Sequence, residues 1–137
     1  MINEAKNFAI ERHKGQLDDE GKDYYENHLL RVDIILNCIT QDDDIRSAGI
    51  LHDVLEDIDT TYDELKEKFG EKVANIVNEV THEGKKDNKG FYFPRLHSKD
   101  AILIKFADRL SNLSRMNSWT KERQIHYLKH SKFWRSE

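Results

Sequence analysis

The chain has 137 residues, 37% of them hydrophobic and 35% charged, with a formal net charge of -4. This length supports one domain with a sizeable core, and the acidic balance argues against a general nucleic-acid-binding protein, which would carry a basic excess. No apolar run approaches transmembrane length, and the first residues lack the basic and then apolar pattern of a signal peptide. The single cysteine, Cys38, cannot form an internal disulfide, which is typical of reducing compartments. We therefore expect a cytoplasmic protein that binds neither nucleic acid nor a membrane.

The first two predicted helices carry their apolar residues at helical spacing. One covers about residues 2–14 and the other about residues 24–39. His28 lies on the apolar face of the second helix, which is formed by Val32, Ile35, Leu36 and Ile39. An imidazole on such a face is either a core histidine with satisfied hydrogen bonds or a ligand of a metal ion. Helical spacing leaves both interpretations open.

The third predicted helix starts near Asp42 or Asp43 and continues through an apolar run into the segment HDVLED, residues 52–57. Because residues four apart share a helix face, His52 should lie beside Glu56, and Asp53 beside Asp57. Three carboxylates can lie together in an interior only if a positive charge offsets them or their pKa values rise. A divalent cation is the simplest remedy, and adjacent His and Asp side chains can both bind one.

Two further helices are predicted before an irregular segment. Residues 61–64 have the form of a capping box and should open a helix that Gly70 ends, and the apolar spacing over residues 73–80 predicts the next one. The irregular segment, residues 82–99, contains the only proline and five basic residues, namely Lys85, Lys86, Lys89, Arg95 and Lys99.

The last two predicted helices cover about residues 98–115 and 119–134. In the first of them, one stripe of apolar residues is the expected core face, namely Leu103, Phe106, Leu110 and Leu113. Asp108 and Asn112 lie on the neighbouring stripe, where Asp108 is either a metal ligand or half of a salt bridge with Arg109. Since no alternating strand pattern occurs, we predict an all-α fold, a single domain over residues 1–137 with about six or seven helices.

Two histidines and two aspartates from three of these helices form a candidate ligand set, namely His28, His52, Asp53 and Asp108. A mixed set of nitrogen and oxygen donors suits Mn²⁺, Fe²⁺ or Zn²⁺ better than a thiolate-preferring ion. Spacing alone therefore predicts a metal site, but it does not indicate which reaction the site catalyses.

Several segments together resemble the hydrolase domain of RelA/SpoT homologues, within the HD superfamily of metal-dependent phosphohydrolases. They are HKGQ at 13–16, Tyr24 or Tyr25 shortly before His28, LHDVLED at 51–57, FG at 69–70, VT at 80–81 and KFADRLSN at 105–112. The resemblance spans about residues 5–115, so the last predicted helix lies outside it. It implies a helical HD domain that removes the 3′-pyrophosphate from ppGpp, a nucleotide alarmone.

The resemblance also implies roles for individual residues. The four candidate ligands would hold one ion, Mn²⁺ in that family, while Glu56 and Asp57 match the catalytic acidic pair. Asn112 matches a residue near the nucleotide. Basic side chains are expected to hold the phosphates, namely Lys14, Arg95, Lys105 and Arg109.

One segment departs from the family pattern. Many alarmone hydrolases carry an Arg-Lys pair after the Gly-Gln, whereas residues 16–22 here are acidic and about one residue longer before His28. The same chemistry on another nucleotide, such as a dNTP or NADPH, is therefore an alternative, as is a nucleotide-binding regulatory module without turnover. All expected ligand and catalytic positions are filled, which favours an enzyme.

Overall fold

The computed structural model describes residues 1–57, 60–81 and 98–130. Their regular structure is helical, in the order α1 (Ile2–Arg12), the π-helical turn η1 (Tyr25–Leu29), α2 (Leu30–Asn37), α3 (Asp43–Ile50), α4 (Val54–Asp57), α5 (Tyr62–Phe69), α6 (Glu71–Val80), α7 (Lys99–Leu113), the 3₁₀ turn η2 (Met116–Ser118) and α8 (Lys121–His130). The one extended pairing among these residues is an isolated bridge between Leu17 and Asp23. None of the described helices combines the length and apolar character that crossing a membrane requires. The all-α prediction is confirmed.

Side chains that precede helices bind the free N–H groups of the first turn. Asp42 accepts a hydrogen bond from the Asp44 amide at 2.9 Å, and Thr61 accepts one from the Glu64 amide at 3.1 Å. Ser98 does the same for α7, with 3.1 Å to the Ala101 amide. Since the first N–H groups of a helix have no partner within it, these residues fix where α3, α5 and α7 begin, as the sequence predicted.

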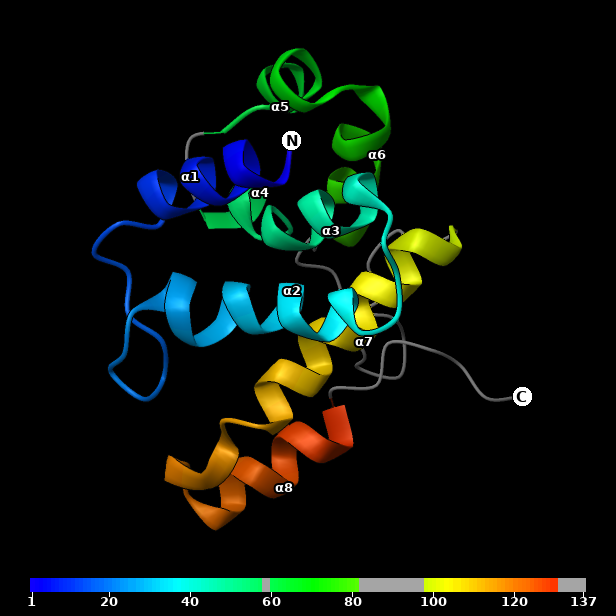
Figure 1. Ribbon diagram of the computed structural model, residues 1–137. Helices are drawn as coiled ribbons and strands as arrows, with labels where there is room; N and C mark the ends of the chain where they lie inside the picture. Colours follow the sequence, from blue (N-terminus) through cyan, green and yellow to red (C-terminus); the bar gives the residue numbers. More distant parts are fainter. Residues whose placement is uncertain (58–59, 82–97, 131–137) are drawn as a thin grey trace.

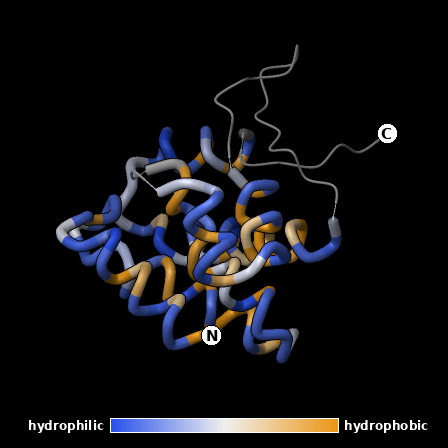
Figure 2. Tube along the Cα trace, turned by 90° about the horizontal axis from the view of Figure 1, so that it is seen from above, coloured by the Kyte–Doolittle hydropathy of each residue, from blue (hydrophilic) through white to orange (hydrophobic). Residues whose placement is uncertain are grey.

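The centre of the molecule is formed by α2, which packs against α3 and α7, while α3 also packs against α1 and α6. Figure 1 shows α7 crossing α2 and leading to α8, at the end of the molecule away from α5. Along the helices short hydrophobic stretches alternate with hydrophilic ones (Figure 2), as expected of amphipathic helices that share one core. The close approach of α2 and α3 depends on Gly49, where a Cβ would lie 2.3 Å from Cδ1 of Leu36.

The predicted core face of α7 is wrong. Phe106, Leu110 and Leu113 are 43%, 52% and 40% exposed, and Leu103 is only partly buried against the core. The buried face is the neighbouring stripe, formed by Ala101, Ile104, Lys105, Ala107, Asp108 and Ser111. Because this stripe carries the polar side chains of Lys105, Asp108 and Ser111 inward, a search for apolar periodicity selected the outer face of the helix.

Two predicted segments extend beyond the described residues. The irregular segment lies largely in residues 82–97, and the last helix is described only as far as His130. Hydrogen bonds join the two sides of the gap at residues 82–97. Glu79 of α6 accepts them from the backbone amide and the hydroxyl of Ser98, at 3.1 and 3.0 Å.

Replacing Gly49 by alanine should destabilise the protein, because Leu36 is fully buried and must shift to admit a methyl group. We expect a net loss of about 1–2 kcal/mol, since overpacking exceeds the gain in helix propensity. Urea denaturation followed by far-UV circular dichroism measures it. The exposed Asn37→Ala serves as control and should change stability by less than about 0.5 kcal/mol. A Gly49→Ala protein as stable as the parent would contradict the close helix contact.

Candidate metal centre

His28 lies in a π-helical turn that precedes α2. The backbone amide of Leu30 donates to the carbonyl of Tyr25, five residues earlier, so this turn contains one residue more than a turn of α-helix. Such turns occur often at functional sites. The turn carries His28 inward, and this residue is only 2% exposed.

His52 and Asp53 lie in a turn between α3 and α4, and not within one continuous helix. The chain leaves α-helical geometry at Leu51, and the amide of His52 makes only a long 3.4 Å bond to the carbonyl of Gly49. The prediction of one continuous helix through residues 52–57 is therefore wrong. The side chains of Glu56 and Asp57 are not described, so their pairing with His52 and Asp53 stays a prediction. Adjacent residues of a regular helix point about 100° apart, so this break lets both side chains face one point.

Asp108 of α7 completes a group of four side chains whose atoms converge. Oδ1 of Asp108 lies 3.0 Å from Nε2 of His28 and 3.1 Å from Nε2 of His52. Oδ2 of Asp53 lies 3.2 Å from Nε2 of His52 and 3.8 Å from Nε2 of His28. Three of the four residues that sequence analysis selected, His28, His52 and Asp108, each place a ligand atom within 4.8 Å of the other two. Asp53, the fourth, lies beside the two histidines.

These donors fit a divalent cation. Ligand atoms about 2.0–2.2 Å from a common ion lie about 3.0–3.6 Å from one another. Three of the four carboxylate–imidazole separations fall in this range, and the fourth, from Asp53 to His28, is 3.8 Å. His52 donates from Nδ1 to the carbonyl of Gly49 at 2.7 Å, so its Nε2 keeps a lone pair for an ion. Holding the second ring nitrogen in this way is the usual arrangement of histidine ligands.

The electrostatics of the cluster also call for a positive charge at its centre. Burial opposes the ionisation of Asp53, but His52 beside it holds the pKa of that carboxyl well below its usual range. Burial likewise opposes the ionisation of Asp108, and hydrogen bonds from His28 and His52 keep its pKa low. The pKa of His52 is raised well above the ordinary value, since Asp53 and Asp108 outweigh the effect of burial. Two buried carboxylates therefore need a positive charge beside them. The imidazole of His52 can carry this charge when it is protonated, and a bound metal ion can take its place.

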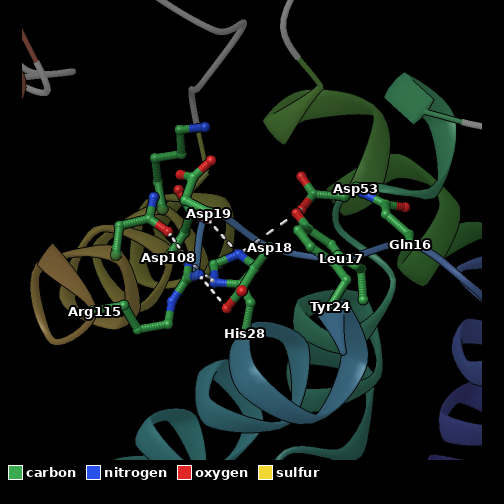
Figure 3. A pocket seen from close by; sticks show the side chains of 11 residues that line it. Gln16, Leu17, Asp18, Asp19, Tyr24, His28, Asp53, Asp108 and Arg115 are labelled. Carbon is green, nitrogen blue, oxygen red and sulfur yellow. Dashed lines mark hydrogen bonds and ion pairs between the residues drawn. The ribbon is translucent and has the colours of Figure 1, made fainter. Parts of the chain in front are cut away.

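The cluster opens into a pocket of about 360 Å³. Figure 3 shows Arg115 and Asp108 approaching His28 from one side, and Tyr24 meeting Asp53 on the other. The Tyr24 hydroxyl donates a hydrogen bond to Oδ2 of Asp53. The pocket is lined by Gln16, Leu17, Asp18, Asp19, Tyr24, His28, Asp53, Lys105, Asp108, Asn112 and Arg115.

The predicted substrate-binding residues are not all found here. Lys105 and Asn112 line the pocket, whereas the exposed Lys14 does not. Arg109 donates to Oδ2 of Asp108 at 3.1 Å. This is the salt bridge that the sequence analysis gave as the alternative role of Asp108. Arg95 lies outside the described residues.

The predicted catalytic pair follows the metal cluster directly. Glu56 and Asp57 form the last two residues of α4, which begins one residue after Asp53. Their side chains lie outside the described part of the structure, so their catalytic role stays a prediction.

Six of the residues that line this pocket were not predicted as site residues. Three of them make hydrogen bonds in the cluster or the loop, Tyr24 with Asp53 and Arg115 with Asp18. Tyr24 could have been found, because it lies four residues before His28 and was already part of the resemblance. Asp18 was considered only as an obstacle to an anionic substrate. Arg115 gave no signal, since it follows the last residue of α7 and lies 97 residues from its partner Asp18.

A second pocket of about 210 Å³ shares Asp19 and Asn112 with the first. Its other lining residues belong to the segment after α7, namely Trp119, Arg123, His126 and Tyr127. The two aromatic rings meet edge to face with centroids 5.4 Å apart, and the guanidinium of Arg123 lies 4.0 Å from the Trp119 ring centroid. Asn112 joins the two pockets, because its side-chain amide donates to the Tyr127 hydroxyl at 3.0 Å.

Comparison with known proteins agrees with this geometry. The profile of the HD domain family matches residues 5–88. The guanosine-3′,5′-bis(diphosphate) 3′-pyrophosphohydrolase MESH1 of Xenopus tropicalis is 38% identical, over 100% of this chain and 82% of its own length. The guanosine-3′,5′-bis(diphosphate) 3′-pyrophosphohydrolase of Aquifex aeolicus is 37% identical over 90% of this chain, which spans only 19% of that longer protein.

A solved structure has the same architecture. It is described as a metazoan ortholog of SpoT that hydrolyses ppGpp, and it superposes with a TM-score of 0.79 at 30% identity, over 95% of this chain and 80% of the other. Its likeness covers the helices that carry the four converging side chains. The chain therefore belongs to the HD domain family of metal-dependent phosphohydrolases, in the group that contains these guanosine-3′,5′-bis(diphosphate) 3′-pyrophosphohydrolases.

Proposed function

We propose that this protein is a metal-dependent guanosine-3′,5′-bis(diphosphate) 3′-pyrophosphohydrolase, which converts ppGpp to GDP and pyrophosphate. The observation that carries this proposal is the buried cluster of His28, His52 and Asp108, with Asp53 beside the two histidines, at a pocket that His28, Asp53 and Asp108 line. The names of the relatives supply the substrate, and they agree with the enzyme that the sequence predicted.

We infer that these four residues hold one divalent cation. Mn²⁺ is our first choice, because nitrogen and oxygen donors suit it, and Fe²⁺ and Zn²⁺ accept the same ligand types. A cation bound there supplies an acidified water and neutralises charge on the phosphoryl oxygens. The protein's own contribution is to hold His52 in the tautomer that offers Nε2, and to orient Asp53 through the Tyr24 hydroxyl.

Glu56 and Asp57 are our candidates for the general base and the general acid. Phosphoryl transfer needs little covalent participation by the enzyme, so the placement of a proton acceptor and a proton donor is its main chemical task. The proposal is supported by position, since both residues follow Asp53 within one turn of helix. A carboxylate there can take a proton from water, and a carboxylic acid can protonate the leaving oxygen.

The two joined pockets suit the two parts of a nucleotide. Lys105 lies in the first pocket beside Asp108 and carries a positive charge for the phosphates. The second pocket offers Trp119 and Tyr127, whose aromatic faces and edges are well suited to a nucleobase. Asn112 reaches both, consistent with a contact near the nucleotide.

We also infer that the substrate is encountered in the cytoplasm. Cys38 is a free and exposed thiol, which a reducing compartment preserves.

Asp108→Asn should abolish tight binding of Mn²⁺. The change removes one negative charge and offers the cation a weaker donor between two imidazoles, so we expect affinity to fall by about a hundredfold or more. Isothermal titration calorimetry with Mn²⁺ measures it, and circular dichroism checks that the protein stays folded. Asp100→Asn, in the first turn of the same helix, is the matched control and should bind Mn²⁺ like the parent. Unchanged affinity in Asp108→Asn would remove this residue from the site.

With Mn²⁺ present, the purified protein should release pyrophosphate from ppGpp, as resolved by anion-exchange chromatography. Glu56→Gln should lower kcat by about 10²–10⁴, the usual contribution of a general acid or base, while Mn²⁺ binding persists. Glu67→Gln, exposed on α5, is the control and should keep full activity. Turnover only of dNTPs or NADPH would assign a different substrate, and tight ppGpp binding without turnover would identify a regulatory module.

A further inference from the structure

The charges lining the main pocket do not match an anionic substrate at first sight. Four carboxylates line it, from Asp18, Asp19, Asp53 and Asp108, against two basic side chains, Lys105 and Arg115. Asp53 and Asp108 face the metal cluster. If the proposed function holds, on which the inference about Arg115 rests, the pocket must accept a polyphosphate next to the carboxylate of Asp18.

Asp18 does not present a free charge to the pocket. Its Oδ1 accepts the backbone amides of Glu20 and Lys22 at 2.9 Å each, and its Oδ2 accepts hydrogen bonds from Asn27 and Arg115. Burial opposes ionisation of this carboxyl, but these four donors keep its pKa below the usual range. Asp18 therefore acts as a fixed anionic anchor in the loop before η1.

Arg115 is the group that this anchor holds. Its side chain is 6% exposed, and Nη1 donates to Oδ2 of Asp18 at 3.1 Å. Nη2 donates to the side-chain oxygen of Asn112 at 2.5 Å, and Nε donates to the carbonyl of Ser111 at 3.3 Å. A guanidinium has five N–H donors in a rigid fork, and one Nη1 hydrogen of Arg115 has no acceptor among the described residues.

The contact of Arg115 with His28 competes with another hydrogen bond. Nη2 of Arg115 lies 3.0 Å from Nδ1 of His28, and the Ser111 hydroxyl lies 2.9 Å from the same atom. Nδ1 cannot accept from Arg115 and donate to Ser111 at once. If the Nδ1–H of His28 donates to the Ser111 hydroxyl, Nη2 of Arg115 makes no hydrogen bond with this ring nitrogen.

We propose that Arg115 is a phosphate-binding residue of this site, held at the pocket by Asp18 and Asn112. The Asp18–Arg115 pair places the positive charge of the pocket at the end of α7, although the loop facing it is acidic. The planar fork of arginine can serve Asp18 with one nitrogen and a phosphate oxygen with the others.

The test separates phosphate binding from catalysis. Inorganic phosphate is titrated into the Mn²⁺-loaded protein by calorimetry, and Mn²⁺ alone is titrated into the metal-free protein. Arg115→Met should weaken phosphate binding by about tenfold or more, the usual loss for a hydrogen bond to a charged group. Its affinity for Mn²⁺ should be unchanged or higher, because a neighbouring positive charge and a competitor for Nδ1 are gone. With ppGpp, KM should rise more than kcat falls.

Arg31→Met is the matched control. Arg31 donates to the hydroxyl of Ser114 at 2.8 Å, and Ser114 directly precedes Arg115 in the sequence. Arg31 lines neither pocket. It should bind phosphate and Mn²⁺ like the parent. The inference is overturned if Arg115→Met binds phosphate as tightly as the parent, or if Mn²⁺ and phosphate affinity fall together, which would mean that Arg115 only positions His28. Neither result depends on whether ppGpp is the substrate.

Should Arg115→Met fail to fold, Arg115→Lys decides. A lysine keeps the charge but cannot serve Asp18 and a phosphate through a fork, so phosphate binding should fall by about threefold or more. Binding equal to that of the parent would overturn the inference.

Discussion

Two buried carboxylates that face two buried imidazoles are the constraint on which the rest of this structure depends. Asp53 and Asp108 lie within 3.0–3.8 Å of His28 and His52, in an interior where an unpaired charge is costly. The side chains come from η1, from the turn after α3 and from α7, and both α3 and α7 pack against α2, the helix that continues η1. The site is therefore a part of the core, and its geometry is set by the packing of the elements that carry it.

This constraint explains where sequence reasoning succeeded. His28, His52, Asp53 and Asp108 could be predicted because polar side chains on otherwise apolar faces are unusual, and four of them in a mixed donor set suggest one ion. The helix starts at Asp42, Thr61 and Ser98 could be predicted because capping is local chemistry that needs no tertiary information.

The failures have the same origin. In α7 the inward face carries Lys105, Asp108 and Ser111, so the apolar stripe of Phe106 and Leu110 pointed the prediction to the outer side. At Leu51 the helix was expected to continue, because nothing in the local sequence requires a break. The chain leaves helical geometry at Leu51, so His52 and Asp53 lie in a turn that the spacing of a continuous helix does not describe. Periodicity therefore misleads where function sets the burial of polar groups.

The acidic loop before η1 follows the same logic of charge pairing. Judged by composition, residues 16–22 would repel a polyphosphate. In the fold, Asp18 is enclosed by donors that include Arg115, and Asp19 lies 2.7 Å from Arg123, although that second pair is half exposed and adds little stability. A carboxylate whose lone pairs are all engaged acts as a structural anchor, and the charge that reaches the pocket is that of its partner. The charge that a pocket presents to a ligand thus depends on the ion pairs that line it. The member of a pair that keeps unused hydrogen-bonding groups on the pocket side determines that charge. Here that member is the guanidinium from the end of α7.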